Sequence, residues 1–191
     1  MSLVELIAGA DDRGLAASGL ACLDRCVPLL GGDDEILRPL WRSLTETGGD
    51  WGEGLAEARA ALGASDGEGD GAQEDEAGFL ARRMLDAAPD EPTGAGLRAW
   101  ADACSVAALR VHRLLEPADD TAGDHEPLAA RRAGRTDGMS PLVAAELRRQ
   151  ITVLELLAEH GPVGLRRALD VSTEGRRVLR AVVSRRARGR V

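Results

Sequence analysis

Apolar residues recur at helical spacing along most of the chain. In the segment from Thr93 to Pro117 they form one long stripe, made of Leu97, Trp100, Ala101, Cys104, Ala108, Val111 and Leu115. Strand-forming residues are sparse and nowhere alternate cleanly with polar ones. The pattern predicts an all-α protein, a multi-helix bundle of about seven to eight helices.

Capping residues indicate where several helices begin. Ser2–Glu5 and Asp50–Glu53 have the spacing of a capping box, and Asp11 or Asp12 can cap a second helix. A further helix is expected to open at Asp33–Glu35. Later helices are expected at 75–87, at 141–159 after the Ser140-Pro141 cap, at 163–169 and at 173–187.

Two segments, 63–74 and 117–139, have the composition of flexible acidic loops. They are rich in Gly, Ser and acidic residues and hold few large apolar side chains, so burial cannot offset their ordering entropy. Together with the helices they divide one structural domain into the parts 1–62, 63–74, 75–116, 117–139 and 140–191, with a weak turn expected at 128–132. Helix openings at Gly14, Gly54 and Gly96 lie 40 and 42 residues apart. This spacing resembles the period of paired-helix repeats, so a repeat architecture is an alternative.

The composition limits what the core is made of. The chain has no Lys, Asn or Tyr, and only one Phe, which indicates a GC-rich bacterial genome. The core is therefore expected to consist of Leu, Ala and Val around four large rings, those of Trp41, Trp51, Trp100 and Phe79.

The sequence favours a cytoplasmic location. No apolar run reaches the roughly 18 residues of a membrane span, and the first residues lack the pattern of a secretory signal. Three cysteines, an odd number, indicate a reducing compartment. Cys22, Cys26 and Cys104 are expected to be free thiols buried as small apolar side chains.

Charge is distributed unevenly along the chain. Residues 1–62 hold 5 arginines against 11 acidic residues, 63–128 hold 5 against 15, and 129–191 hold 14 against 6. The basic end indicates an acidic partner or nucleic acid, or else attraction to the acidic parts of the same fold or of a second subunit.

Signatures of catalysis are missing from the sequence. It has no GxSxG, P-loop or dinucleotide-binding pattern, and without Lys it has no Schiff-base lysine. His112, His125 and His160 are isolated from one another and from metal-ligand spacings. We therefore expect no catalytic residue and no cofactor, and an enzyme is the weakest class. The best metal candidate is the loop containing Asp119, Asp120, Asp124, His125 and Glu126, whose carboxylates suit Ca²⁺ or Mg²⁺, although an ordinary solvated loop is the alternative.

The C-terminal segment 153–187 resembles a bacterial helix-turn-helix. A helix ending at Gly161-Pro162 is followed by a short helix, the turn Leu169-Asp170-Val171-Ser172 and a basic helix. The resemblance implies that Ser172 caps a recognition helix. The residues that would contact nucleic acid or an acidic partner are Thr173, Arg176, Arg177, Arg180, Arg185 and Arg186. The alternative is a basic amphipathic helix that packs on the acidic bundle.

These observations favour a non-enzymatic helical binding, regulatory or scaffold protein. Apolar residues on two sides of the helix 141–159 suggest a protein partner or self-association, with a homodimer as one form. The first alternative is a nucleic-acid-binding transcriptional regulator. The second is an enzyme or metal-binding protein that uses the Asp119–Glu126 loop.

Overall fold

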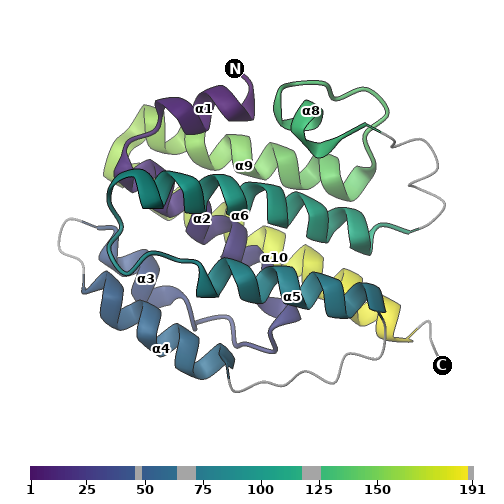
Figure 1. Ribbon diagram of the computed structural model, residues 1–191, viewed down its shortest axis with the longest axis horizontal. Coiled ribbons are helices and arrows are strands. Elements are labelled where there is room, and N and C mark those ends of the chain that lie inside the picture. The colour runs from purple at the N-terminus through teal and green to yellow at the C-terminus, as the bar shows by residue number, and fades with distance from the viewer. Residues whose placement is uncertain (46–48, 64–71, 118–125, 189–191) are drawn as a thin grey trace.

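The chain folds as an all-α multi-helix bundle, as its hydrophobic pattern predicts (Figure 1). The computed structural model describes residues 1–45, 49–63, 72–117 and 126–188, and these contain no strand. None of their helices is both long and apolar enough to span a bilayer. The helices are α1 (Leu3–Gly9), α2 (Asp12–Cys26), α3 (Arg38–Ser43), α4 (Trp51–Gly63), α5 (Ala72–Asp86), α6 (Gly94–Leu115), α8 (Leu128–Arg132), α9 (Pro141–His160) and α10 (Gly164–Arg188), with 3₁₀ turns η1 (Val27–Leu29) and η2 (Gly161–Val163).

Helix α2 lies at the centre of the bundle and packs against α6, α9 and α10. Every residue from Gly14 to Cys26 is buried, which is the pattern of a helix enclosed on all sides. Its small residues let neighbours approach closely: a Cβ on Gly19 would lie 2.5 Å from the Trp100 ring. Since α2 contacts helices from the far end of the chain, the 40- and 42-residue spacing does not build a stack in which each repeat meets only its neighbours.

The predicted capping residues do begin their helices. The Ser2 hydroxyl accepts a hydrogen bond from the Glu5 amide, and the Glu5 carboxylate accepts one from the Ser2 amide at 2.7 Å. Asp11 caps α2 by accepting from the Gly14 amide at 2.7 Å, and Asp50 accepts from the Glu53 amide at 2.8 Å at the start of α4.

The helix expected to begin at Asp33–Glu35 begins later, at Arg38. Asp33 accepts a hydrogen bond from the Glu35 amide at 2.5 Å, which closes a local turn. Pro39 lies in the first turn of α3, where a proline needs no amide partner. Pro39 is therefore accommodated at the start of α3 without bending it.

The predicted break between two C-terminal helices is wrong. Residues 164–188 form one continuous helix, α10, so the expected turn 169–172 is helical and Ser172 is buried within it. No Gly or Pro interrupts this turn, and β-branched residues lower helix propensity only slightly. Gly175 lies where α10 crosses α2, and a Cβ there would overlap the Arg25 side chain.

Three of the four large rings lie in the core, and the fourth does not. Trp41, Trp51 and Trp100 are buried, with the Trp51 and Trp100 rings edge to face at 6.0 Å. Phe79 on α5 is 59% exposed, so its predicted place in the core is wrong. The three cysteines are buried free thiols, as predicted.

Both apolar sides of α9 are covered within the chain. The helix packs against α1, α2, α6 and α10, and it buries Val143, Leu147, Val153, Leu154 and Leu157. Ala158, near the C-terminal end of the helix, is exposed. The two-sided pattern that suggested self-association is thus explained by intramolecular packing.

Candidate functional site

Arg176 and Arg180, in the middle part of α10, face the protein's own acidic groups. Arg176 is buried, and its Nη1 donates to Asp24 Oδ1 on α2 at 2.5 Å. Its Nε lies 3.3 Å from Asp34 Oδ1, to which Arg180 Nη2 donates at 2.6 Å. These arginines therefore join α10 to the N-terminal part of the chain.

The other four predicted contact residues are spread around α10. Thr173 is half-buried, and Arg186 donates to the Leu114 carbonyl at 2.8 Å. Arg177 is exposed and lies 3.9 Å from Glu174, and Arg185 is also exposed. The six residues do not form the single outward face that a recognition helix presents, since Arg176 points inward.

Burial and arginine contacts shift the pKa values of the two carboxylates in opposite directions. Burial raises the pKa of Asp24 above its ordinary value, although Arg176 and Arg25 oppose the shift. The hydrogen bond from Arg180 lowers the pKa of Asp34, which lies nearer the surface.

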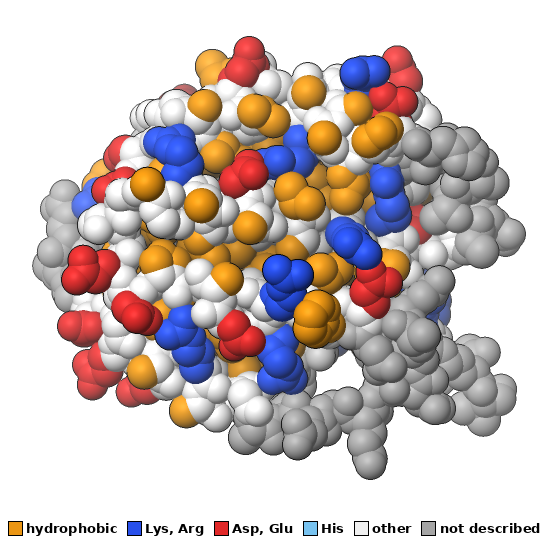
Figure 2. All heavy atoms as spheres, viewed as in Figure 1, with side chains coloured by type: hydrophobic (Ala, Val, Ile, Leu, Met, Phe, Trp, Pro, Cys, Tyr) orange, Lys and Arg blue, Asp and Glu red, His pale blue; other side chains and the backbone are white. Residues whose placement is uncertain are grey.

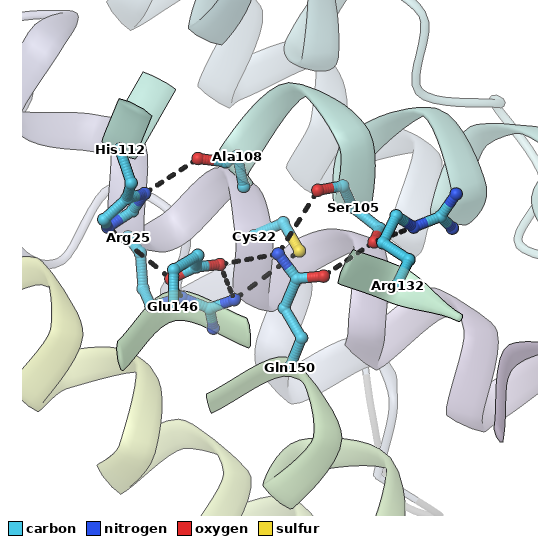
Figure 3. A network of polar contacts seen from close by, with 8 residues as sticks. All are labelled: Cys22, Arg25, Ser105, Ala108, His112, Arg132, Glu146 and Gln150. Carbon is cyan, nitrogen blue, oxygen red and sulfur yellow. Dashed lines mark hydrogen bonds and ion pairs between the residues drawn. The ribbon is translucent and has the colours of Figure 1, made fainter. Parts of the chain in front are cut away.

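A second polar cluster, which the sequence analysis missed, lies in the middle of the bundle (Figure 3). Arg25 on α2 and Glu146 on α9 form a fork-like ion pair with no exposed side-chain surface. Arg25 Nε donates to Oε2 at 2.8 Å and Nη2 donates to Oε1 at 2.6 Å. This two-bond geometry is the strongest form of an arginine–carboxylate contact.

Hydrogen bonds extend this pair to α6 and α8. Gln150 Nε2 donates to Glu146 Oε1 at 2.8 Å, and the Ser105 hydroxyl donates to Gln150 Oε1 at 2.6 Å. Arg132 Nε donates to the Ser105 hydroxyl at 3.1 Å, and its guanidinium also pairs with Asp102 at the surface. The chain of contacts thus runs from the C-terminal end of α2 through Gln150 and Ser105 to Arg132 (Figure 3).

His112 and Cys22 flank the ion pair and are both fully enclosed. His112 Nδ1 lies 2.8 Å from the Ala108 carbonyl, and Nε2 lies 3.6 Å from Glu146 Oε2. Burial lowers the pKa of His112 below its ordinary value despite the neighbouring Glu146. Burial also raises the pKa of Cys22 to about 12, which disfavours the thiolate form near neutral pH.

Arg25 and Glu146 show no surface to solvent, so the cluster acts as a structural clamp. Burial opposes ionisation of Glu146, but Arg25, His112 and the Gln150 amide outweigh it and hold its pKa below the ordinary value. The sequence did carry a signal for this cluster. Gln150 lies within the apolar stripe of α9, and Arg25 interrupts a run of Ala, Leu and Cys.

An apolar groove of about 370 Å³ lies between α5 and α6, and we call it the α5–α6 groove. It is lined by Leu80, Arg83, Met84, Ala87, Trp100, Ala103, Cys104, Val106, Ala107 and Arg110. Phe79 lies beside it on α5, with the Arg83 guanidinium 5.8 Å from the ring centre, and Val106 is 37% exposed. Figure 2 shows hydrophobic side chains gathered in a band across the face formed by α5 and α6.

A larger groove of about 570 Å³ lies between α3 and the segment that leads into α10, and we call it the α3–α10 groove. Its lining comes from α3 and Thr45 on one side and from η2 and the first turns of α10 on the other. The residues are Arg38, Trp41, Arg42, Thr45, Pro162, Val163, Leu165, Arg166 and Leu169. The lining thus combines an apolar surface with three guanidinium groups.

Most of the predicted metal loop lies outside the described residues. This holds for Asp119, Asp120, Asp124 and His125, whereas Glu126 is described and pairs with Arg135 at 3.1 Å. In the part of the chain that the structure describes, no group of three or more His, Cys, Asp or Glu side chains is placed to hold an ion. The predicted loops 63–74 and 117–139 are likewise outside it at 64–71 and 118–125, and α8 forms at the weak turn predicted for 128–132.

No family model, no curated protein and no solved structure matches this chain. A functional assignment therefore rests on the geometry and chemistry of the two grooves and of α10.

Proposed function

We propose that the protein is a non-catalytic helical binding protein that holds an amphipathic helix of a partner in the α5–α6 groove. The observation that carries the proposal is the exposure of Phe79, the chain's single phenylalanine, beside an apolar groove. Exposing a large ring to water is unfavourable, and an exposed ring next to a contiguous apolar surface is typical of interaction sites.

The lining of the groove suits a helix. Ala103 and Ala107 are one turn apart on α6, and Leu80 and Met84 are one turn apart on α5. The small alanine side chains leave room between these two rows of residues. A partner helix with apolar residues at i, i+3, i+4 and i+7 can place them between these two rows. Methionine adapts its shape to different apolar partners, which favours such a contact.

The charges beside the groove favour an acidic partner over a second copy of this chain. Arg83 and Arg110 flank the apolar lining, and Arg110 pairs with Glu76. A two-fold contact through this groove would bring the arginines of both copies together, because each copy uses the same surface. A helix with carboxylates at the edges of its apolar stripe would instead complement them.

The test places a photo-crosslinking phenylalanine analogue at position 79 and, as a control, at the exposed Val4, which lines neither groove. In cells that natively contain the protein, position 79 should give one discrete crosslinked partner. The crosslinked peptide should be an acidic amphipathic helix that binds purified wild-type protein and loses about tenfold or more in affinity with Phe79→Ser. Crosslinking only between copies of this chain, or equal binding of the variant, would refute the proposal.

Nucleic-acid binding is the second candidate, and the exposed arginines of α10 favour it. Arg166, Arg167, Arg177, Arg185 and Arg188 are exposed along this helix. The overall charge of −8 opposes binding to a polyanion, and Arg176 and Arg180 already have acidic partners. Fluorescence anisotropy with random duplex DNA tests it, because binding through phosphates must weaken steeply with salt. Absence of binding at about 50 mM salt would exclude this candidate.

A further inference from the structure

The α3–α10 groove is distinct from the α5–α6 groove and shares no lining residue with it. Its floor includes Trp41 and Leu165, both buried beneath the surface, and Leu169. Pro162 and the exposed Val163 form part of its wall. Pro162, Val163 and the half-buried Leu169 therefore present apolar surface to solvent above Trp41 and Leu165, at the opposite end of α10 from Arg185.

Arginine side chains surround this apolar surface, and no carboxylate contributes to the lining. Arg38 pairs with Glu35 at 2.5 Å. Arg42 and Arg166 form no ion pair with any residue that the structure describes. The chain carries 32 acidic residues against 24 basic ones, so an all-basic lining departs from the overall balance. An anion in the groove would compensate these charges.

The size of the groove admits a small molecule, and the shortness of one wall disfavours a helix. Its volume of about 570 Å³ falls within the range of roughly 300–1,000 Å³ that small-ligand sites occupy. The wall formed by α3 has only six residues, so it is about 9 Å long, too short to line two turns of a bound helix. Guanidinium groups bind carboxylate, phosphate and sulfonate groups through paired hydrogen bonds.

We propose that the α3–α10 groove binds a small organic anion with an apolar body. The apolar body lies over Trp41, Leu165 and Leu169, and the anionic group contacts Arg42 and Arg166 from opposite walls. Arg38 adds positive charge at the rim, because its exposed partner Glu35 screens it only in part. Binding here needs no partner helix in the α5–α6 groove.

The first experiment compares two probes that share their aromatic rings. The anionic probe is 8-anilino-1-naphthalenesulfonate, and N-phenyl-1-naphthylamine has the same rings without the sulfonate. Fluorescence titration of the folded protein should give one saturable site for the anionic probe and much weaker binding of the neutral one. Equal binding of both probes would show that the arginines do not select an anion and would overturn the proposal.

Variants locate the site. Arg42→Gln and Arg166→Gln should each raise the Kd of the anionic probe about tenfold or more, because a charge-assisted hydrogen bond is lost. Arg167→Gln is the matched control, since Arg167 is exposed, neighbours Arg166 and does not line the groove. Val163→Glu places a carboxylate in the wall at an exposed position and should also abolish binding, without depending on either arginine. Loss of binding with Phe79→Ser, or no loss with the groove variants, would place the probe elsewhere and refute the proposal.

Competition identifies the chemical class of the ligand. Decanoate and decyl phosphate should displace the probe, and decanol should not. Displacement by either anion supports the proposal. The more effective competitor shows whether the guanidinium groups prefer a carboxylate or a phosphate. Displacement by an acidic peptide without displacement by either small anion would contradict it and assign the groove to a protein partner.

Discussion

Two arginine–carboxylate clusters fasten α2 to helices from the other end of the chain, and they differ in exposure. Arg25–Glu146 joins α2 to α9 and has no solvent-exposed surface. The second cluster joins α2 to α10 and reaches the surface, from the buried Arg176–Asp24 pair to Asp34 and Arg180, which are nearly half exposed. The same two chemical groups therefore act in two dielectric environments.

The comparison teaches that neighbouring arginine charges and hydrogen bonds together decide what burial does to the pKa of a carboxylate. Both oxygens of Glu146 accept hydrogen bonds from Arg25, and its pKa is lowered although it is fully enclosed. Only Oδ1 of Asp24 accepts a hydrogen bond from Arg176, and its pKa is raised. Burial thus leaves the first carboxylate ionised and brings the second closer to neutrality.

Breaking the enclosed pair should have the largest effect. Glu146→Leu leaves the Arg25 guanidinium buried without a counter-charge, and we expect the free energy of unfolding to fall by about 3–5 kcal/mol. The double variant Arg25→Met with Glu146→Leu is the control, and it should recover most of the loss because no charge is left buried. Urea denaturation measures both. A loss below about 1 kcal/mol in the single variant would contradict the assignment of a clamp.

Removing Arg176 should have an intermediate effect. Arg176→Met leaves Asp24 buried, but this carboxyl can take up a proton because its pKa is already raised. We expect a loss of about 1–3 kcal/mol at pH 7 and a smaller loss near pH 5, where the neutral acid is easier to form. Denaturation at the two pH values measures the difference. An equal loss at both would show that Asp24 stays ionised.

The pH dependence of stability should identify the contribution of His112. Its pKa in the folded protein lies below the ordinary value, so the unfolded chain takes up a proton that the folded protein resists. Stability contributed by the neutral ring is present above about pH 6.5 and is lost as the pH falls, by at most about 1.4 kcal/mol per pH unit. His112→Gln should reduce this slope between pH 7 and 5. If the slope is unchanged in the variant, the pH dependence of stability in this range comes from other titratable groups.

The exposed end of the second cluster should contribute least. Arg180→Gln removes the contact with Asp34, and both side chains are nearly half exposed. We expect a loss of about 0.5 kcal/mol or less, which disappears in high salt because surface charges are screened. Thermal unfolding at low and high salt measures it, with Arg185→Gln as the exposed control. A loss comparable to that of Arg176→Met would remove the distinction between the two ends.

The parts of the fold that local chemistry determines were predictable. Ser2, Asp11 and Asp50 begin helices because a side-chain oxygen meets an amide three residues away. The stripe of α6 gives its length and its buried face, because apolar spacing repeats with the helical turn. These features depend on residues within one or two turns of each other.

The candidate sites depend on contacts that no local pattern contains. Arg25 and Glu146 are 121 residues apart, and Arg176 and Asp24 are 152 apart. The sequence showed that α10 is basic, but not that Arg176 meets a buried carboxylate. Phe79 was assigned to the core from its chemistry, whereas its exposure depends on where α5 lies against α6. The α3–α10 groove combines apolar and basic residues from two segments that are more than 100 residues apart in sequence. Only the packing of these segments against each other shows that they line one groove.

The enclosure of α2 has a consequence for the order of events during synthesis. This helix exposes apolar surface on every side until α6, α9 and α10 have formed, and α10 begins 138 residues after α2 ends. At the usual elongation rates of about 5–20 residues per second, the ribosome needs roughly 7–28 seconds to cover that distance. Throughout this interval α2 lacks at least one of the helices that enclose it in the folded protein. A chaperone that binds apolar helices would therefore act most effectively on the first third of this protein.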